Sequence, residues 1–172
     1  MITLRQWPHG SRELLNELYA ECDQSMCLVR LPVPLPKEET DRYMHIIETG
    51  NNQGRPFLCF GIYLDDVLIG KTELTRYEEG SAEADIIIQK DYCSKGYGTK
   101  ALQELISTAR AEEWCERIIA YIDLQNRAAL KLFAKAGFQK GRTFRADVAV
   151  YEQGSLRVET HSGLECVKEL QI

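Results

Sequence analysis

The segment CSKGYGTKAL, from Cys93 to Leu102, holds the residues whose types and spacing most clearly indicate chemistry. Gly96 and Gly98 stand one residue apart, and the apolar residues after them recur at helical spacing. A helix start offers free backbone N–H groups and the positive end of the helix dipole, and an anion can approach a glycine closely because it has no Cβ. The segment therefore predicts a binding site for a phosphate group.

A dinucleotide is one candidate for the ligand that carries this phosphate, because the segment matches a dinucleotide-binding motif. Gly96, Gly98 and Ala101 satisfy the pattern G-x-G-x-x-A, and Glu116 follows about twenty residues later, as that motif requires. In the motif, however, the first glycine follows the strand almost directly, whereas the residues QKDYCSK separate the expected strand end at Ile88 from Gly96. Glu116 also precedes the next expected strand instead of ending it, so this match is weak.

A nucleotide P-loop is a second candidate, because Gly-Lys-Thr occurs at residues 70–72. A P-loop also needs an earlier glycine, and Asp65 stands at that position. The residues after Thr72 keep a strand pattern, whereas a P-loop leads into a helix. We therefore interpret this tripeptide as part of a strand.

Hydrophobic periodicity predicts the elements that must position the glycine pair. Strands are expected at residues 2–7, 57–64, 67–77, 82–88 and 117–124, and the tail from Val148 predicts two or three further antiparallel strands. Helices are expected to begin at Ser11, which can cap the first of them, near Lys37, at Gly96 and at Asn126.

The order of these elements predicts one mixed α/β domain. The three strands between residues 57 and 88 form an antiparallel meander, because tight polar turns join them. The strand that ends at Ile88, a long helix from Gly96 to Trp114 and the strand 117–124 form a β-α-β unit. Its two strands should be parallel, with a right-handed crossover.

The whole set, from this strand to the ending AGF at Phe138, resembles motif A and the following motif B of the GNAT acetyltransferases. The resemblance extends over residues 83–138 with matching order and spacing. It implies that the phosphate belongs to acetyl-CoA, the cosubstrate of that family. It also implies the fold class α/β (α+β), a GNAT fold whose mixed central sheet of about seven strands carries a β-α-β acetyl-CoA-binding core and four helices. We expect a single domain over residues 1–172.

The loop pattern of the family, R/Q-x-x-G-x-G/A, falls here on residues 93–98. Cys93 stands where the family usually has Arg or Gln, so one side-chain contact is lost while the backbone contacts should remain. By resemblance, the pantetheine arm of acetyl-CoA pairs with the strand backbone near Ile86 and Ile88. The contacts that the resemblance implies come from Ile86, Ile88, Cys93, Ser94, Lys95, Gly96, Tyr97, Gly98, Thr99, Asn126 and Phe133.

Acetyl transfer to an amine needs a base for the amine, a donor to the thioester oxygen and a proton source for the leaving thiolate. The candidates for the base are acids on the strands beside the cofactor, namely Glu73, Glu83, Asp85 and Asp123. Glu83 is the first choice, by resemblance to a strand acid that often serves as base in the family. Asp85 shares its face, because strand side chains alternate.

The family often protonates the thiolate with a tyrosine in the short helix after Asn126, and Phe133 occupies that slot here. Tyr121, Tyr97 or water then supplies the proton, or CoA leaves as the thiolate. Asn126 is expected to position the cofactor or a bound water. We therefore expect Glu83, Asn126 and Tyr121 as catalytic residues and Phe133 as a contact.

Cysteine and histidine side chains offer further chemistry. A position at a helix start would lower the pKa of Cys93 and make it reactive, with oxidation or a mixed disulfide with CoA as a more natural consequence than a nucleophilic role. His9, His45 and His161 could act as bases, but we expect each on the surface or in a turn.

Composition argues against several other classes of protein. The net charge is -5, and Lys and Arg are scattered among Asp and Glu, so the basic stripe of a nucleic-acid-binding protein is missing. The six cysteines form no CxxC pair and have no His at zinc-ligand spacing, which predicts free thiols and no metal site. No apolar run of about eighteen residues occurs, so we expect neither a signal peptide nor a membrane span and infer a reduced, cytoplasmic protein.

The resemblance predicts an acetyl-CoA-dependent N-acetyltransferase that moves the acetyl group directly to a primary amine of a small molecule or a protein N-terminus. The front third of the chain looks like the RimJ/RimL branch, and acids such as Asp41 on the acceptor side favour a cationic amine. The tail at residues 143–161 is expected to shape the choice of substrate, and its stretch TFRADVAVYEQG, residues 143–154, predicts either a strand of a homodimer interface or a substrate lid. A second hypothesis is a module that senses acetyl-CoA without turnover, motivated by Phe133 and Cys93.

Overall fold

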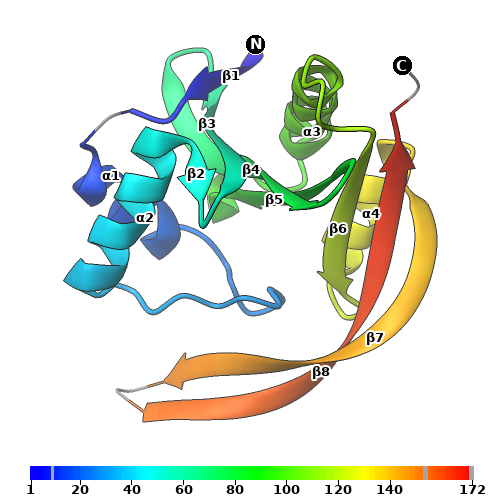
Figure 1. The fold of residues 1–172 in the computed structure, drawn as a ribbon. Coiled ribbons are helices and arrows are strands. Elements are labelled where there is room, and N and C mark those ends of the chain that lie inside the picture. The colour runs from blue at the N-terminus through cyan, green and yellow to red at the C-terminus, as the bar shows by residue number, and fades with distance from the viewer. Residues whose placement is uncertain (9, 153–154, 171–172) are drawn as a thin grey trace.

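The structure is a computed structural model that describes residues 1–8, 10–152 and 155–170. Its strands are β1 (Ile2–Gln6), β2 (Asn51–Asn52), β3 (Arg55–Leu64), β4 (Val67–Glu78), β5 (Ser81–Ile88), β6 (Arg117–Asp123), β7 (Gln139–Glu152) and β8 (Ser155–Glu169). Its helices are α1 (Arg12–Ala20), α2 (Lys37–Thr49), α3 (Tyr97–Arg110) and α4 (Arg127–Lys135). The described strands form one mixed sheet in the order β1-β3-β4-β5-β6-β8-β7, with β2 paired to β3 beside this path (Figure 1).

Helices cover both faces of the sheet. Strand β3 shows why, because its side chains alternate between two apolar environments. Phe57 and Cys59 pack with the core residues of α1 and α2, whereas Leu58 and Phe60 pack against the core that α3 and α4 share. We call the first of these faces the acceptor face and the second the core face.

The β-α-β unit is built as the sequence predicts. Strands β3, β4 and β5 form the antiparallel meander, and β6 pairs parallel to β5. This parallel pairing covers only residues 81–83 of β5 and 117–119 of β6. Beyond it, β5 continues to Ile88 beside β4, and β6 continues to Asp123 beside β8. A gap therefore opens between the carboxyl ends of β5 and β6 (Figure 1).

The end of the long helix differs from the sequence prediction. Helix α3 ends at Arg110 and does not reach Trp114. The N–H groups of Glu116 and Arg117 both donate to the Gly80 carbonyl, at 2.8 and 3.0 Å. The chain must therefore leave the helix before Glu116 to enter β6 beside the start of β5.

The predicted helix starts are correct in position, with one difference in the capping bond. Ser11 is the N-cap residue of α1, but its hydroxyl donates to the Pro8 carbonyl and caps no helix N–H. Asn126 is the N-cap residue of α4, and its Oδ1 accepts from the Ala129 N–H at 3.0 Å. The α4 cap thus satisfies an N–H group that the first helical turn would leave without a partner.

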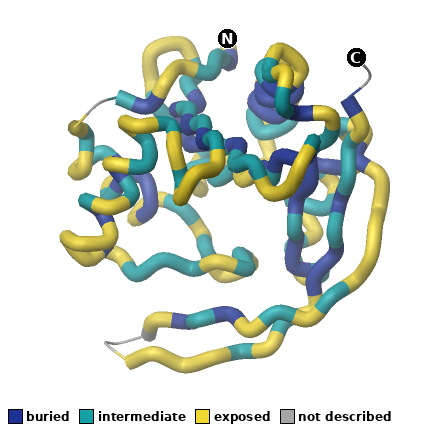
Figure 2. Tube along the Cα trace, viewed as in Figure 1, coloured by how far each residue is buried: buried dark blue, intermediate teal, exposed yellow. Residues whose placement is uncertain are grey.

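The tail folds as two long antiparallel strands, where the sequence predicted two or three. Strand β7 pairs only with β8 and lies at the edge of the sheet. The two strands extend well past the sheet as a curved ribbon (Figure 1). Val148 and Val150 are buried on one side of this ribbon, whereas Tyr151, Leu156 and Val158 are exposed (Figure 2).

No helix in the described part of the chain is long and apolar enough to cross a lipid bilayer.

Candidate functional site

The loop between β5 and α3 forms a concave turn at the predicted phosphate site. A single 3-10 turn, Lys90–Tyr92, follows β5, and Ser94 and Gly96 then adopt positive φ angles of 61° and 83°. Such a backbone can turn successive N–H groups toward one point, as anion-binding nests do. A Cβ placed on Gly96 would meet no atom within 4 Å, so the space outside the loop is open. The loop fits a phosphate on these two grounds.

The first turn of α3 adds more donors to this loop. Gly96 is the N-cap residue of the helix, so the N–H groups of Tyr97, Gly98 and Thr99 have no helical partner. A Cβ on Gly98 would lie 3.2 Å from a methyl group of Ile88, so this glycine also lets α3 pack closely on β5. These amides are among those of residues 93–99 that the sequence predicts as contacts of the cofactor.

Strand β5 turns part of its backbone toward the gap. The Thr72 hydroxyl donates to the Asp85 carbonyl at 2.7 Å, which places that carbonyl on the β4 side. The Ile86 N–H belongs to the same planar peptide and therefore points the opposite way, into the gap. The Asp85 carboxylate accepts this N–H at 2.9 Å. The predicted backbone donor at Ile86 thus faces the gap, and the neighbouring carboxylate occupies it.

The Ile88 carbonyl also points away from β4. The Gln89 N–H, in the same peptide, donates to the Ile69 carbonyl on β4 at 2.9 Å. The Ile88 carbonyl must therefore point to the opposite side, where the Cys93 thiol lies 3.6 Å away. Ile86 and Ile88 both present backbone groups to the gap, as pairing with an extended ligand would require.

Three acids lie together on the acceptor face beside the gap. Glu73 lies directly opposite Asp85 in the β4–β5 register, and Glu83 shares the face of Asp85 two residues earlier. Among the described residues, no cation forms an ion pair with Glu83 or Asp85. Burial, and to a smaller extent the charge of Asp85, raises the pKa of Glu83. Asp41, in contrast, is ion-paired with Arg12 at 2.8 Å.

Lys71 neutralises the third of these acids. Its side chain is 1% exposed, and its ammonium contacts the Glu73 carboxylate and the Tyr43 hydroxyl. The same ammonium lies over the rings of Tyr19 and Tyr43, at 5.6 and 4.9 Å from the ring centres. Burial lowers the pKa of Lys71 and raises that of Glu73. Glu73 is therefore held in a buried pair, which leaves Glu83 and Asp85 as the acids available to a ligand.

Tyr121 lies on the acceptor face of β6, near Glu83. Its ring packs edge-on between Tyr77 and Phe144, at 5.9 and 5.4 Å between ring centres. Burial is the main cause that raises the pKa of Tyr121 to about 12. The hydroxyl therefore keeps its proton at neutral pH and can act as a donor.

The other predicted residues of the short helix have structural roles in addition to their predicted ones. Phe133 is 3% exposed and packs edge-on against Phe138 at 4.9 Å in the core of the protein. Asn126 caps α4 through its oxygen, and its amide nitrogen donates to the Met26 carbonyl at 3.3 Å. Contacts of either side chain with a cofactor stay predictions.

The model of one protein family matches residues 2–139, and its description is acetyltransferase (GNAT) domain. This match covers most of the chain and includes the loop, the gap and all the predicted site residues. The chain belongs to the GNAT acetyltransferase family. The resemblance of residues 83–138 to that family is thereby confirmed.

Solved structures of GNAT proteins share the fold over nearly the whole chain. A RimL ribosomal L7/L12 alpha-N-protein acetyltransferase in complex with CoA aligns with a TM-score of 0.76 and 14% identity, covering 98% of this chain and 94% of that one. A spermidine N-acetyltransferase from Vibrio cholerae, in complex with CoA and spermine, aligns with a TM-score of 0.72 and 17% identity, covering 98% and 95%. A search of curated proteins finds no significant match. The predicted mixed sheet and four helices of the GNAT fold are confirmed.

The expectation that Cys93 has a lowered pKa is wrong for this GNAT domain. Cys93 follows the 3-10 turn and lies four residues before α3 begins, too far to feel the dipole of that helix. Its thiol faces the carbonyl oxygens of Ile88 and Gln89, at 3.6 and 3.5 Å. Burial, followed by the charge of Asp23, raises its pKa. The side chain is therefore a thiol at neutral pH and a poor nucleophile.

We expect the substitution Cys93→Ser to keep full turnover, because serine preserves a short donor toward the same carbonyl oxygens. Steady-state rates of both proteins with acetyl-CoA and one acceptor amine would measure this. A loss of more than tenfold in kcat, with unchanged binding of acetyl-CoA, would instead indicate a covalent role for the thiol.

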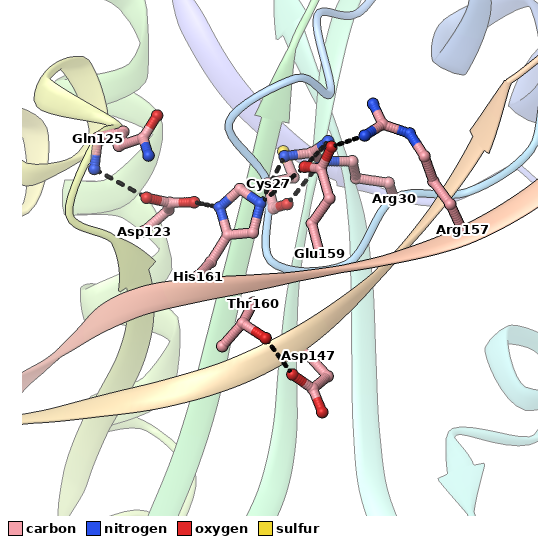
Figure 3. A network of polar contacts seen from close by, with 9 residues as sticks. All are labelled: Cys27, Arg30, Asp123, Gln125, Asp147, Arg157, Glu159, Thr160 and His161. Carbon is pink, nitrogen blue, oxygen red and sulfur yellow. Dashed lines mark hydrogen bonds and ion pairs between the residues drawn. The ribbon is translucent and has the colours of Figure 1, made fainter.

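The histidine predictions have three different outcomes. His45 is exposed on α2, as expected, and His9 lies outside the described residues. The surface position expected for His161 is wrong, because its side chain is only 10% exposed. Its Nδ1 contacts Asp123, and its Nε2 lies 3.0 Å from Glu159, so both ring nitrogens have carboxylate partners (Figure 3).

The sequence analysis did not anticipate the contacts of Lys71 with Glu73 or of His161 with Asp123. Strand alternation could have placed Lys71 on the face of Glu73. The contact of His161 with Asp123 depends on the β6–β8 register, for which the sequence has no local signal.

Other surface features lie away from the gap. One hollow of 310 Å³ is lined by residues such as Arg110 and Lys168. A second hollow of 380 Å³ is lined by residues such as Arg42 and Asn51. They contain none of the predicted site residues, so we base the site on the loop and the strands. In the described ranges, no group of three or more His, Cys, Asp or Glu side chains is arranged to hold a metal ion.

Proposed function

We propose that this GNAT protein transfers the acetyl group of acetyl-CoA directly to a cationic primary amine of a small molecule or a protein N-terminus. The observation that carries the proposal is the pair Glu83 and Asp85, two acids that form no ion pair within the described chain, on the wall of the gap between β5 and β6. An ammonium group is the ligand that such a pair binds best.

The loop and the gap supply the contacts for acetyl-CoA. The amides of residues 96–99 would bind its pyrophosphate at the start of α3, where the helix dipole favours an anion. The backbone of Ile86 and Ile88 would pair with its pantetheine arm. When bound, acetyl-CoA would supply an activated acetyl group, and CoA would leave as a thiolate.

The Ile86 N–H is placed to polarise the carbonyl of the acetyl group. A backbone amide aimed at an oxygen that gains negative charge lowers the barrier of acyl transfer. Asp85 accepts this N–H at 2.9 Å, so its carboxylate must turn away when the carbonyl takes its place. The released carboxylate then needs a new partner, and the ammonium of the acceptor provides one.

Glu83 is the residue proposed to take a proton from that ammonium. Its raised pKa, caused first by burial, brings it closer to the range in which a carboxylate accepts a proton and returns it to solvent. The neutral amine then attacks the carbonyl carbon, the carbon–sulfur bond breaks, and the nitrogen releases its remaining excess proton to solvent as the amide forms. Tyr121, whose hydroxyl stays protonated, or water protonates the thiolate. Asn126 is proposed to position the cofactor or a bound water, as the sequence predicts.

The neighbours support the class of acceptor without identifying it. One is named for an alpha-N-protein acetyltransferase of a ribosomal protein, and another is a spermidine acetyltransferase solved with spermine. Both names denote acetylation of an amine. Their identities of 14% and 17% support only a common fold, so the choice between a peptide and a polyamine rests on experiment.

An amine panel tests this proposal. The protein is incubated with acetyl-CoA and with spermidine, an aminoglycoside, a basic peptide and a neutral hydrophobic amine, and free CoA and product mass are measured. We expect acetylation of at least one cationic amine and little of the neutral one. Tight binding of acetyl-CoA without turnover of any amine would contradict the proposal and favour a sensing module.

A further inference from the structure

Residues 21–36, which we call the strap, connect α1 to α2 and bridge the two strand ends that border the gap. At one end, the Glu21 carbonyl accepts the Lys90 N–H at 2.8 Å, just after β5. Further on, the Met26 carbonyl accepts from the side chain of Asn126 at 3.3 Å, just after β6. The strap thus lies across the mouth of the gap, between the sheet and the distal part of the β7–β8 ribbon (Figure 1).

Four charged side chains fasten the strap to the sheet, and we call them the latch: Arg30, Asp123, Glu159 and His161. The guanidinium of Arg30 lies 3.5 Å from the Glu159 carboxylate and 3.4 Å from His161 Nε2 (Figure 3). The Arg30 Nε–H also donates to the Cys27 carbonyl at 3.2 Å, within the strap. The latch therefore joins the strap, β6 and β8 at one point.

Three members of the latch are largely removed from water, whereas Glu159 is 28% exposed. The side chains of Asp123, His161 and Arg30 are 0%, 10% and 14% exposed. The second oxygen of Asp123 accepts the Gln125 N–H at 2.8 Å, which holds the carboxylate in place. Buried charges that lose a partner are strongly destabilised, so the members of the latch depend on one another.

The charge of His161 decides the strength of the latch. The ring is flanked by Asp123 on β6 and Glu159 on β8, and Arg30 reaches it from the strap. Arg157 on β8 contacts the other oxygen of Glu159. The protonated ring donates to both carboxylates, whereas a neutral ring can donate to only one of them. Because Nε2 of the protonated ring cannot accept a hydrogen bond, Arg30 then fastens the strap through its ion pair with Glu159.

Two more titratable groups lie near the latch, namely the Cys27 thiol of the strap and the Asp85 carboxylate of β5. They interact electrostatically with each other.

The hydrogen bond to Glu159, followed by that to Asp123, raises the pKa of His161. A raised pKa in the folded state means that the latch is complete below the ordinary imidazole pKa of about 6.5 and weakens as the pH rises through the folded-state value.

We propose that Arg30 and His161 are positioning residues whose latch holds the strap over the gap as the outer wall of the acceptor site. This inference rests on the proposed function for its kinetic consequence, but its structural part does not. His161 is not the proposed base, because both of its ring nitrogens face carboxylates of the latch and not the acceptor site. Opening of the latch loosens the strap and weakens binding of the acceptor.

Hydrogen exchange of the full chain, followed by mass spectrometry, tests the structural part. In Arg30→Gln, we expect amides of residues 21–36 to exchange about tenfold faster while those of residues 97–110 do not change. Arg42→Gln is the matched control, because Arg42 forms an exposed ion pair with Glu39 on α2. Unchanged exchange of the strap in Arg30→Gln would overturn the proposal.

The pH dependence separates the latch from ordinary packing. In the wild-type protein, protection of residues 21–36 relative to 97–110 should fall as the pH is raised from about 6 to about 9, after correction for intrinsic exchange rates. His161→Gln should remove this dependence. A wild-type strap whose protection is independent of pH would overturn the proposal even if the variant fails to fold.

Kinetics provide a separate readout. Arg30→Gln should raise the KM for the acceptor about tenfold and leave the dissociation constant of acetyl-CoA within about twofold, because the latch contacts the acceptor side. An unchanged KM for the acceptor would contradict the proposal that the strap forms the outer wall of the acceptor site. If no amine is acetylated at all, the proposed function fails, while hydrogen exchange still decides whether the latch exists.

Discussion

The substitution Gly96→Val is expected to weaken binding of acetyl-CoA about 100-fold, the loss that follows when about two hydrogen bonds to a charged group, each worth about 1.5 kcal/mol, cannot form. Gly96 has a φ of 83° and opens α3 at the phosphate loop. A branched side chain there projects into the open space that the phosphate would occupy. It also disfavours the left-handed backbone that aims the amides. Isothermal titration calorimetry with acetyl-CoA measures the effect.

Gly54→Val is a closely matched control for this variant. Gly54 has the same φ of 83°, and a Cβ there would also meet no atom within 4 Å, but it lies in the turn before β3. Both variants should lose about 1–2 kcal/mol of stability through the left-handed backbone. Only Gly96→Val should lose the ligand. Equal affinities of the two variants would show that the loop does not hold the phosphate.

Glu83→Gln is expected to lower kcat by a factor of about 10² to 10⁴, the usual contribution of a general base. Glutamine keeps the size of the side chain but cannot accept the proton of the acceptor. Burial raises the pKa of Glu83, so the wild-type rate should rise with pH as this carboxyl ionises. The rate of the Glu83→Gln variant should not show this rise with pH. Stopped-time assays of CoA release across a range of pH would measure both effects.

The control for this prediction is Glu113→Gln, at an exposed acid in the turn between α3 and β6. It removes the same charge from the chain far from the gap, and its kcat should match the wild type. Binding of acetyl-CoA should be the same in all three proteins, since Glu83 faces the acceptor. A Glu83→Gln enzyme with a normal kcat would eliminate Glu83 as the base.

The parts of the fold that depend on neighbours in sequence could be predicted from the sequence. The glycines at 96 and 98, the helix after them and the cap at Asn126 each have a local signal, because turn and cap conformations restrict the residue type. The parallel pairing of β5 and β6 follows from the helix between them, which returns the chain to the end of the sheet where β5 began. The loop and the gap are assembled from these elements, so the cofactor side of the site could be anticipated.

The acceptor side could not be predicted in the same way. The strap meets β8 through Arg30 and Glu159, which are far apart in sequence, and only the three-dimensional structure joins them. His161 was expected on the surface for this reason. The prediction for Cys93 failed on a finer point, because the dipole of α3 acts within its first turn and the thiol lies outside it. Long-range register and short-range electrostatics are therefore the two limits of the sequence interpretation.

The most direct test of the central claim is calorimetric and thermal-shift titration of the reduced protein with acetyl-CoA, desulfo-CoA and NAD. We predict that both CoA species bind at one site and NAD does not. At about a hundred times the dissociation constant, either CoA species should add about 2.7 kcal/mol to the free energy of unfolding. Absence of CoA binding, or stabilisation by NAD alone, would contradict the assignment of the loop at residues 93–99 and the mechanism built on it.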